Sequence, residues 1–284
     1  MKLQLFKLAI YLSAAALLAG CEGAVTVDMS AAAPADRQIT SVAVDVAGLE
    51  FERSDGSTEK LEFTSSLPTD LIDVLDTDDL RLFTDESLPD GTYTGVRLLF
   101  DEDIDATVFH ATDGEFPLLY AEGDFADVDF TVAEDDRTNE SISLMMDLRR
   151  SLTFNDDDDE YTLTPSLRAV RTAEAGQISG TVVATCPFGS SLAEGGAVYL
   201  YQGEDIDPDD VGSGGTQPFA TTAVSFNFGT QATYSLRLLP PGDYTVALTC
   251  NGEIDEPGSD EDVSFVSTAN VTVDEDSVTY DFGS

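Results

Sequence analysis

The stretch LPDGTYT at residues 88–94 returns in the second half of the chain as LPPGDYT at residues 239–245. In both copies a glycine follows a proline two residues later, which predicts a tight turn. Proline presets its own φ, and glycine accepts the left-handed backbone. Tyr93 or Tyr244 then opens a strand, where its ring can cover the edge of a core. This internal repeat predicts that both halves are β-sandwiches of related type.

Outward from these turns, short runs of alternating or apolar residues are separated by turn signals, which favours antiparallel sandwiches. A helix capped by Thr69 is expected at 69–75. The strands predicted before residue 172 are 24–29, 42–46, a hairpin at 51–63, 93–100, 127–132, 141–148 and 161–170. Those predicted after it are 178–185, 197–201, 223–228, 233–238, 244–249, 263–273 and 277–282. The predicted fold class is all-β, with two antiparallel β-sandwich domains in tandem.

The composition excludes several functions. The chain has 284 residues, with 55 Asp+Glu against 13 Lys+Arg and a single His. Phosphate backbones need a basic face, so nucleic acid is excluded as a partner. One His leaves no room for a multi-histidine metal site. At 42% hydrophobic residues, the chain still has enough apolar material for packed cores.

The first 20 residues are predicted to be a signal peptide. Lys2 and Lys7 precede an apolar run at 8–18, which is shorter than the roughly 20 residues that span a bilayer. The run ends in LAGC at 18–21, which resembles the bacterial lipobox. The resemblance implies cleavage before Cys21 and lipid, such as palmitate, on Cys21. Since Glu22 rather than Asp follows, it also implies sorting to the outer membrane, on either face. The alternative is an ordinary signal peptide in which Cys21 is incidental.

The remaining cysteines, Cys186 and Cys250, form an even pair in an oxidising compartment. A period of two places each of them on an apolar strand face. A disulfide between them would stabilise the fold by about 4 kcal/mol on the chain-entropy model. Two buried free thiols are the alternative.

Five stretches before residue 172 carry a family resemblance: 24–29, 33–36, 88–98, 147–151 and 161–168. Through them, residues 21–172 resemble the domain-of-unknown-function 4382 family of bacterial lipoproteins and secreted proteins. The family commonly has Asp where this chain has Ala32, so any role of that Asp is in doubt here. The resemblance implies no known activity.

The stretches 180–182, 196–200 and 240–244 make residues 173–284 similar to a carboxypeptidase-regulatory-like, transthyretin-type sandwich. That resemblance implies a non-catalytic accessory or stalk module. The boundary between the two domains is expected in the small, polar segment 171–176.

No catalytic residue is predicted. His110 is expected at the surface or at a strand end, and no serine lies in a Gly-x-Ser-x-Gly elbow. Asp205, Asp207 and Asp209 alternate in a loop followed by glycines, where carboxylates can converge on Ca²⁺. The EF-hand pattern fails there, and solvated acidic loops are the alternative.

These observations predict a non-enzymatic, lipid-anchored outer-membrane protein that acts as a binding or structural module. Its expected partners are the membrane, through the lipid, and an envelope protein or polysaccharide. The alternative function is Ca²⁺-dependent adhesion or carbohydrate binding.

Overall fold

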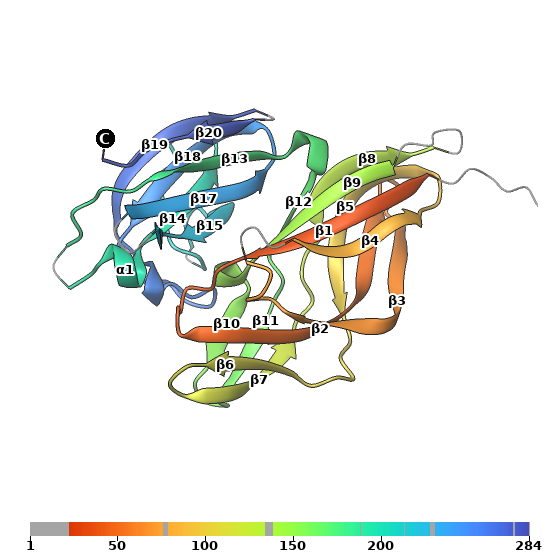
Figure 1. The fold of residues 1–284 in the computed structure, drawn as a ribbon, viewed down its shortest axis with the longest axis horizontal. Helices are drawn as coiled ribbons and strands as arrows, with labels where there is room; N and C mark the ends of the chain where they lie inside the picture. Colours follow the sequence, from red (N-terminus) through yellow and green to blue (C-terminus); the bar gives the residue numbers. More distant parts are fainter. Residues whose placement is uncertain are drawn as a thin grey trace, which may run out of the picture.

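Two pairs of β-sheets, each around its own core, lie side by side along the long axis of the protein (Figure 1). This computed structural model describes residues 23–75, 79–133, 139–187, 189–212, 214–227, 231–274 and 276–283. Cys21 lies outside the described residues. Among the residues described, no helix is long and apolar enough to cross a bilayer.

The first domain contains twelve described strands and a 3₁₀ turn, η1 (Leu148–Arg150). Its strands are β1 (Ala24–Ala32), β2 (Ile39–Arg53), β3 (Thr58–Asp70), β4 (Leu80–Ser87), β5 (Gly91–Phe100), β6 (Ala106–His110), β7 (Gly114–Tyr120), β8 (Ala126–Val132), β9 (Asn139–Asp147), β10 (Leu152–Asn155), β11 (Glu160–Leu163) and β12 (Leu167–Arg171).

A second 3₁₀ turn, η2 (Thr172–Glu174), leads from β12 into the second domain. This domain comprises β13 (Gly176–Thr181), α1 (Leu192–Gly195), β14 (Ala197–Gln202), β15 (Ala220–Ala223), β16 (Ser225–Asn227), β17 (Gln231–Leu239), β18 (Gly242–Thr249), η3 (Gly252–Ile254), β19 (Phe265–Val273) and β20 (Ser277–Thr279).

The first sandwich packs a four-stranded sheet, in the order β12-β9-β1-β4, on a larger sheet in the order β10-β11-β7-β6-β2-β5-β8, with β3 beside β2. Phe51, Tyr93 and Phe130 meet in the core between the sheets, with ring centroids 5.0–6.0 Å apart. Strands β8 and β12 each end a sheet, and they lie next to each other on the side that faces the second domain.

The second sandwich packs the sheet β16-β17-β13-β20 on the sheet β15-β14-β18-β19. Its core contains Tyr234, Val246, Leu248 and Phe282. A separate apolar cluster, which includes Tyr199 and Tyr201, covers the other face of the β14–β18 sheet.

The tyrosine of the repeated turn makes the same hydrogen bond in both domains. The Tyr93 hydroxyl donates to the Pro89 carbonyl at 2.7 Å, and the Tyr244 hydroxyl donates to the Pro240 carbonyl at 2.8 Å. Both tyrosines are buried near the start of a strand, β5 or β18. The prediction that each tyrosine opens a strand at the core edge is confirmed.

The glycines of the repeated turn differ between the two domains. Gly91 has a φ of 158°, whereas Gly242 has no positive φ. The left-handed glycine expected in both copies is therefore wrong at Gly242.

The all-β sandwich prediction is confirmed, and most strand pairs among the described residues are antiparallel, but three pairs are parallel. Strand β1 runs parallel to β9, β7 to β11 and β13 to β20. Alternation along one strand reports which face is buried and says nothing of the direction of its neighbour.

Two predicted elements are also corrected. The helix at 69–75 is instead the end of β3 followed by a turn, because the Asp70 carboxylate accepts hydrogen bonds from the Val42 and Ile72 amides. The single strand at 161–170 is two strands, β11 and β12. They are separated at Pro165 and belong to different sheets.

Candidate functional site

Arginines of the first domain reach across to backbone carbonyls of the second domain. Among the described residues these arginines make no ion pair with a carboxylate, whereas arginines elsewhere, such as Arg81 and Arg97, do. The contacts are Arg37 to the carbonyls of Ala193 (3.0 Å), Gly196 (2.8 Å) and Val224 (3.1 Å), Arg149 to Gly252, Arg150 to Phe219 (3.0 Å) and Arg168 to Arg237 (3.0 Å).

The local structure explains how these side chains reach the junction. The η1 turn directly after β9 carries Arg149 and Arg150. On β12, Ala169 packs into the first core, so alternation turns Arg168 toward the second domain. Each guanidinium presents several N–H donors, which suits it to carbonyl acceptors.

A buried carboxylate reinforces the junction. Asp147, at the end of β9, is 0% exposed. Its side chain accepts hydrogen bonds from the amide (2.7 Å) and the hydroxyl (2.8 Å) of Thr221 in the second domain. In the opposite direction, Arg237 of the second domain pairs with Asp79 of the first at 3.6 Å. These charge-assisted bonds fix the relative position of the two sandwiches.

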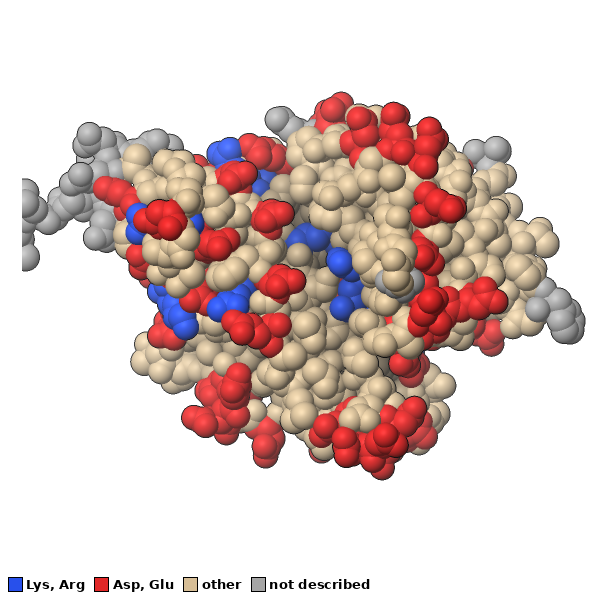
Figure 2. Space-filling model, turned by 180° about the vertical axis from the view of Figure 1, so that it is seen from behind, with Lys and Arg blue, Asp and Glu red and all other residues tan. Residues whose placement is uncertain are grey.

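A groove of about 660 Å³ opens at this junction. The β11–β12 segment and the edge strand β8 supply one part of its lining, and the second domain supplies Gln202, Phe219, Pro240 and Pro241. Figure 2 shows blue atoms gathered in the hollow between two lobes whose outer surfaces are largely red and tan. The basic residues that line the groove are Arg150, Arg168 and Arg171.

Arg168 is the most deeply buried of these three. It is 5% exposed, and its Nε and Nη1 atoms have no hydrogen-bond partner among the described residues. Burial lowers the pKa of Arg168 to about 10, because desolvation penalises the charged form. The ring of Phe219 lies beside its guanidinium, with the centroid 5.9 Å from Cζ. Arg171, by contrast, is paired with Glu140 and Glu174.

The rim of the groove on the β8 side is acidic. Glu122, Asp124, Asp127 and Asp129 line it with exposed carboxylates. Phe125 lies among them, with its ring 4.5 Å from Cζ of Arg97. The groove therefore combines positive groups in its hollow, carboxylates on one rim and the flat faces of Phe and Pro side chains.

A second cluster of side chains has the composition of a metal site. Carboxylate oxygens of Asp210, Asp255 and Glu261 lie within 4.8 Å of one another. Burial raises the pKa of Asp255 to about 6, although it accepts hydrogen bonds from the Tyr199 hydroxyl and the Val211 amide. Oxygen ligands of this kind suit Ca²⁺. The same Tyr199 hydroxyl contacts Arg149, so this cluster adjoins the junction.

The three predicted metal ligands are not brought together. Asp205 has φ of 55° and exchanges hydrogen bonds with Asn270, and Asp209 accepts from the Asp210 amide. Among the described residues, the acidic group within metal-ligand reach includes neither of these nor Asp207. The residue of this loop that joins the cluster is Asp210. Its two partners, Asp255 and Glu261, are distant in sequence, so no local spacing predicts that they lie close to Asp210.

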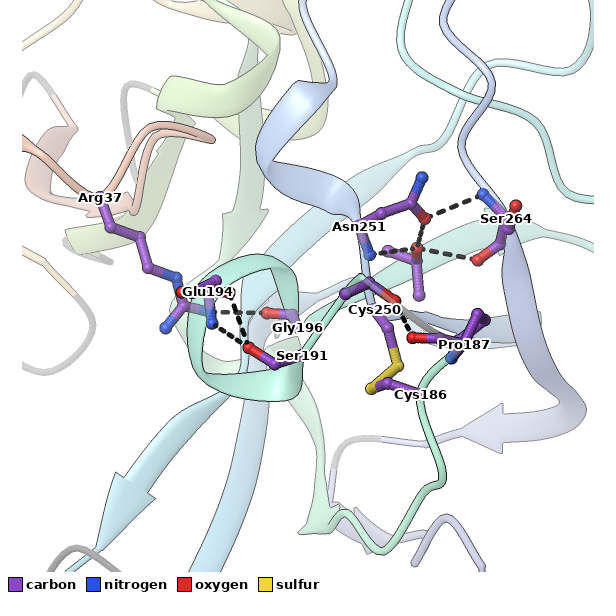
Figure 3. Close-up of a disulfide and its surroundings, with 11 residues drawn as sticks. Arg37, Cys186, Pro187, Ser191, Glu194, Gly196, Cys250, Asn251 and Ser264 are labelled. Atoms are coloured by element: carbon purple, nitrogen blue, oxygen red, sulfur yellow. Dashed lines mark hydrogen bonds between the residues drawn. A yellow bond between two sulfur atoms is a disulfide. The ribbon is translucent and has the colours of Figure 1, made fainter.

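Cys186 and Cys250 form a disulfide, with Cα atoms 5.7 Å apart. Figure 3 shows the bridge close to α1, which Arg37 of the first domain approaches. The bridge therefore ties the segment before α1 to the end of β18, close to one contact of the junction.

His110 ends β6, as expected of a strand-end residue, but it is buried rather than at the surface. Nε2 contacts Asp36 at 3.0 Å, and Nδ1 contacts Thr112 and Asp113 at 3.1 and 2.9 Å. Both ring nitrogens are thus occupied within the first domain.

Sequence reasoning missed the groove. A signal was present, because three of its lining residues are among the few basic residues of a very acidic chain. What the sequence lacks is the information that Arg150 and Arg168, on different elements, meet the second domain at one place.

The profile of a family described as Domain of unknown function (DUF4382) matches residues 22–165. No curated protein matches the chain. Among solved structures, the Bacillus anthracis TIE protein is 10% identical with a TM-score of 0.20; the alignment covers 91% of this chain, which spans 33% of that protein.

Two further structures are similar to the same degree. A proposed cell adhesion protein of Bacteroides fragilis (BF2867) is 12% identical, with 91% of this chain and 92% of that chain covered and a TM-score of 0.20. The minor pilin GBS52 of Streptococcus agalactiae is 13% identical, with 90% and 94% covered and a TM-score of 0.20. At this TM-score the likeness carries no argument about function.

Proposed function

Since the chain belongs to the DUF4382 family, whose description names no activity, we propose from its own geometry that it is a non-catalytic, lipid-anchored binding module of the cell envelope. In this proposal lipid on Cys21 holds the protein at the outer membrane. The two sandwiches present the groove between them to a partner.

The observation that carries the proposal is the junction. Arg37, Arg149, Arg150 and Arg168 contact second-domain carbonyls, and Asp147 contacts Thr221. A groove between two domains keeps its shape only when the domains are held in one position, which suits binding by a preformed surface. The second domain then acts as an accessory sandwich of the carboxypeptidase-regulatory-like type. Its PPGDY turn places Pro240 and Pro241 in the groove.

A non-catalytic role agrees with the chemistry of the described residues. His110 is held by Asp36, Thr112 and Asp113, and its ring contacts no serine or cysteine among them. A nucleophile needs a base within hydrogen-bond reach, and this imidazole is already committed to other partners.

Metabolic labelling tests the anchor. Cells that express the full chain are grown with radiolabelled palmitate, and the expected result is label on the wild type and none on Cys21→Ser. A Cys21→Ser protein that remains labelled, or an unlabelled wild type, would contradict the proposal. The matched control is Ser13→Ala within the leader, which keeps Cys21 and should remain labelled.

The alternative, Ca²⁺-dependent adhesion, is favoured by one observation: the convergence of Asp210, Asp255 and Glu261. Calorimetric titration of the soluble chain with CaCl₂ tests it. If calcium binds there, heat and a rise in Tm are expected for the wild type and not for Asp255→Asn. If neither signal appears in the wild type, this alternative is excluded.

A further inference from the structure

Within its described lining, the groove contains one buried positive group, Arg168, with donor atoms that lack acceptors. Arg168 uses Nη2 to bind the Arg237 carbonyl, while Nε and Nη1 have no partner among the described residues. Arg150 is half-buried beside it; its Nη1 donates to the Phe219 carbonyl at 3.0 Å, and it makes no ion pair with a carboxylate within the described part of the chain. Buried donors without acceptors are rare in native proteins, and each one calls for a ligand, an ion or a water. A carboxylate matches guanidinium donors in charge and geometry.

The rest of the lining indicates what should accompany that carboxylate. The acidic rim formed by Glu122, Asp124, Asp127 and Asp129 can accept hydrogen bonds from hydroxyl groups and repels additional anions. The rings of Phe125 and Phe219, with Pro240 and Pro241, offer flat apolar faces. A sugar ring matches this lining, because it has hydroxyl groups around its edge and apolar C–H groups on its faces.

Long-range charge excludes a polyanion. Without the 20-residue leader, 11 basic residues against 55 acidic ones leave a formal charge of −44. Such a field opposes the approach of a densely charged chain, whereas a mostly neutral chain with a single carboxylate meets little repulsion until it reaches the arginines.

We propose that the groove binds an oligosaccharide in which an isolated uronic-acid residue lies within a neutral sugar chain, with its carboxylate between Arg150 and Arg168. The neighbouring sugars lie on the Phe and Pro faces, and their hydroxyl groups donate hydrogen bonds to the carboxylates of the acidic rim. This inference names the ligand class for the proposed binding function and rests on it.

The test is calorimetric titration of the soluble chain, begun after Cys21, with a tetrasaccharide that contains one glucuronic acid and three neutral hexoses. The comparison ligand is the same tetrasaccharide after reduction of the carboxyl group to an alcohol. Wild-type protein is expected to bind the acidic sugar at least tenfold more tightly than the reduced one. Equal affinity for the two sugars, or no binding of either at millimolar concentration, overturns the proposal.

Variants locate the site. Arg150→Gln is expected to weaken binding of the acidic sugar at least tenfold and to leave the affinity for the reduced sugar unchanged. Arg81→Gln, on β4 at the opposite edge of the sheet from β12, removes one positive charge from a pair with Asp28 and is expected to change neither. If Arg168→Gln fails to fold, the Arg150→Gln result and the wild-type ligand comparison still decide the matter.

Two further outcomes complete the design. A tetrapeptide that binds as tightly as the sugar through its terminal carboxylate would overturn the sugar assignment. Sugar binding that fails while palmitate labels Cys21 rejects this inference and leaves the anchored module in place. If labelling fails while sugar binding is intact, the lipid anchor is rejected and the ligand assigned to the groove stands.

Discussion

The two sandwiches share a tyrosine turn but are stabilised differently. The first, residues 23–172, contains no cysteine and is built on one continuous core with stacked aromatic rings such as Tyr93 and Phe130. The second, residues 173–284, has a smaller core, a separate apolar cluster and the Cys186–Cys250 disulfide. Smaller domains bury a smaller fraction of their surface, so a covalent link contributes proportionally more to them.

Their buried carboxylates differ as well. In the first domain, burial alone would raise the pKa of Glu50, but hydrogen bonding and attraction from Arg97 outweigh it, so the pKa is lowered. In the second domain, burial dominates at Asp255 and raises its pKa to about 6. The comparison teaches that burial alone does not set the direction of a carboxylate's pKa shift: the charged partners dominate at Glu50, and burial dominates at Asp255.

The largest expected effect comes from removing the disulfide. The double variant Cys186→Ser, Cys250→Ser frees a loop with a sequence separation of 64, and the free energy of unfolding should fall by about 4 kcal/mol. Hydrogen exchange measured by mass spectrometry should show faster exchange in β13–β20 and a much smaller change in β1–β12. Equal loss of protection in both domains would show that the first sandwich also depends on the bridge.

The pH response of the second domain is the next effect. Because the folded pKa of Asp255 (about 6) exceeds the unfolded value of 3.8, the folded state binds the proton more tightly. This group therefore adds stability as the pH falls from about 6 to about 4, up to about 3 kcal/mol, and adds nothing further below that range.

Glu50 has the opposite sign, since its stabilisation is present above its unfolded pKa and is lost as the pH falls through its lowered folded pKa. Urea denaturation at pH 7, 6, 5 and 4, followed by domain-resolved hydrogen exchange, compares the two. Asp255→Asn should flatten the pH dependence of the second domain. A variant that keeps the full dependence would assign it to other carboxylates.

Removing a contact between the two domains should make them unfold independently. Asp147→Ala leaves the buried amide and hydroxyl of Thr221 without their acceptor, at a cost of about 2 kcal/mol. Calorimetric scans should then show two separate transitions where the wild type shows more closely coupled unfolding. Asp157→Ala, in the exposed β10–β11 turn, is the matched control and should leave the scan unchanged.

The smallest effect tests the shared turn. Tyr93→Phe and Tyr244→Phe each remove one hydroxyl that donates to a proline carbonyl, and each should reduce stability by about 1 kcal/mol. Urea denaturation of both variants compares the copies directly. Losses that differ by more than about twofold would show that the two turns are not equivalent in energy.

Sequence patterns predicted the second domain better than the first. Strands β14, β17 and β18 appear close to their predicted positions, because β17 alternates and because β14 and β18 are largely apolar runs that begin at or directly after a glycine. In the first domain β4, β6, β7 and β10 were missed. The Asp113-Gly114 pair between β6 and β7 is a hairpin signal that was available. Strand β4 gave no such signal, since its buried residues, Leu82 and Phe83, are adjacent rather than alternating.

The groove could not be read from local patterns, because its residues come from segments that pair only in three dimensions. Arg150 follows β9, Arg168 lies on β12 and Phe219 precedes β15. The disulfide was accessible to sequence reasoning because only two cysteines remained, whereas any of the 55 acidic residues could have joined a metal cluster.

At the junction, most acceptors on the second domain are peptide carbonyls, which every amino acid carries. A side-chain replacement at Ala193, Phe219 or Arg237 leaves the oxygen that an arginine contacts in place. The attachment is therefore vulnerable to mutation mainly on the first domain's side. During evolution the second sandwich can diversify its surface, including its part of the groove, while its docking to the first is inherited unchanged.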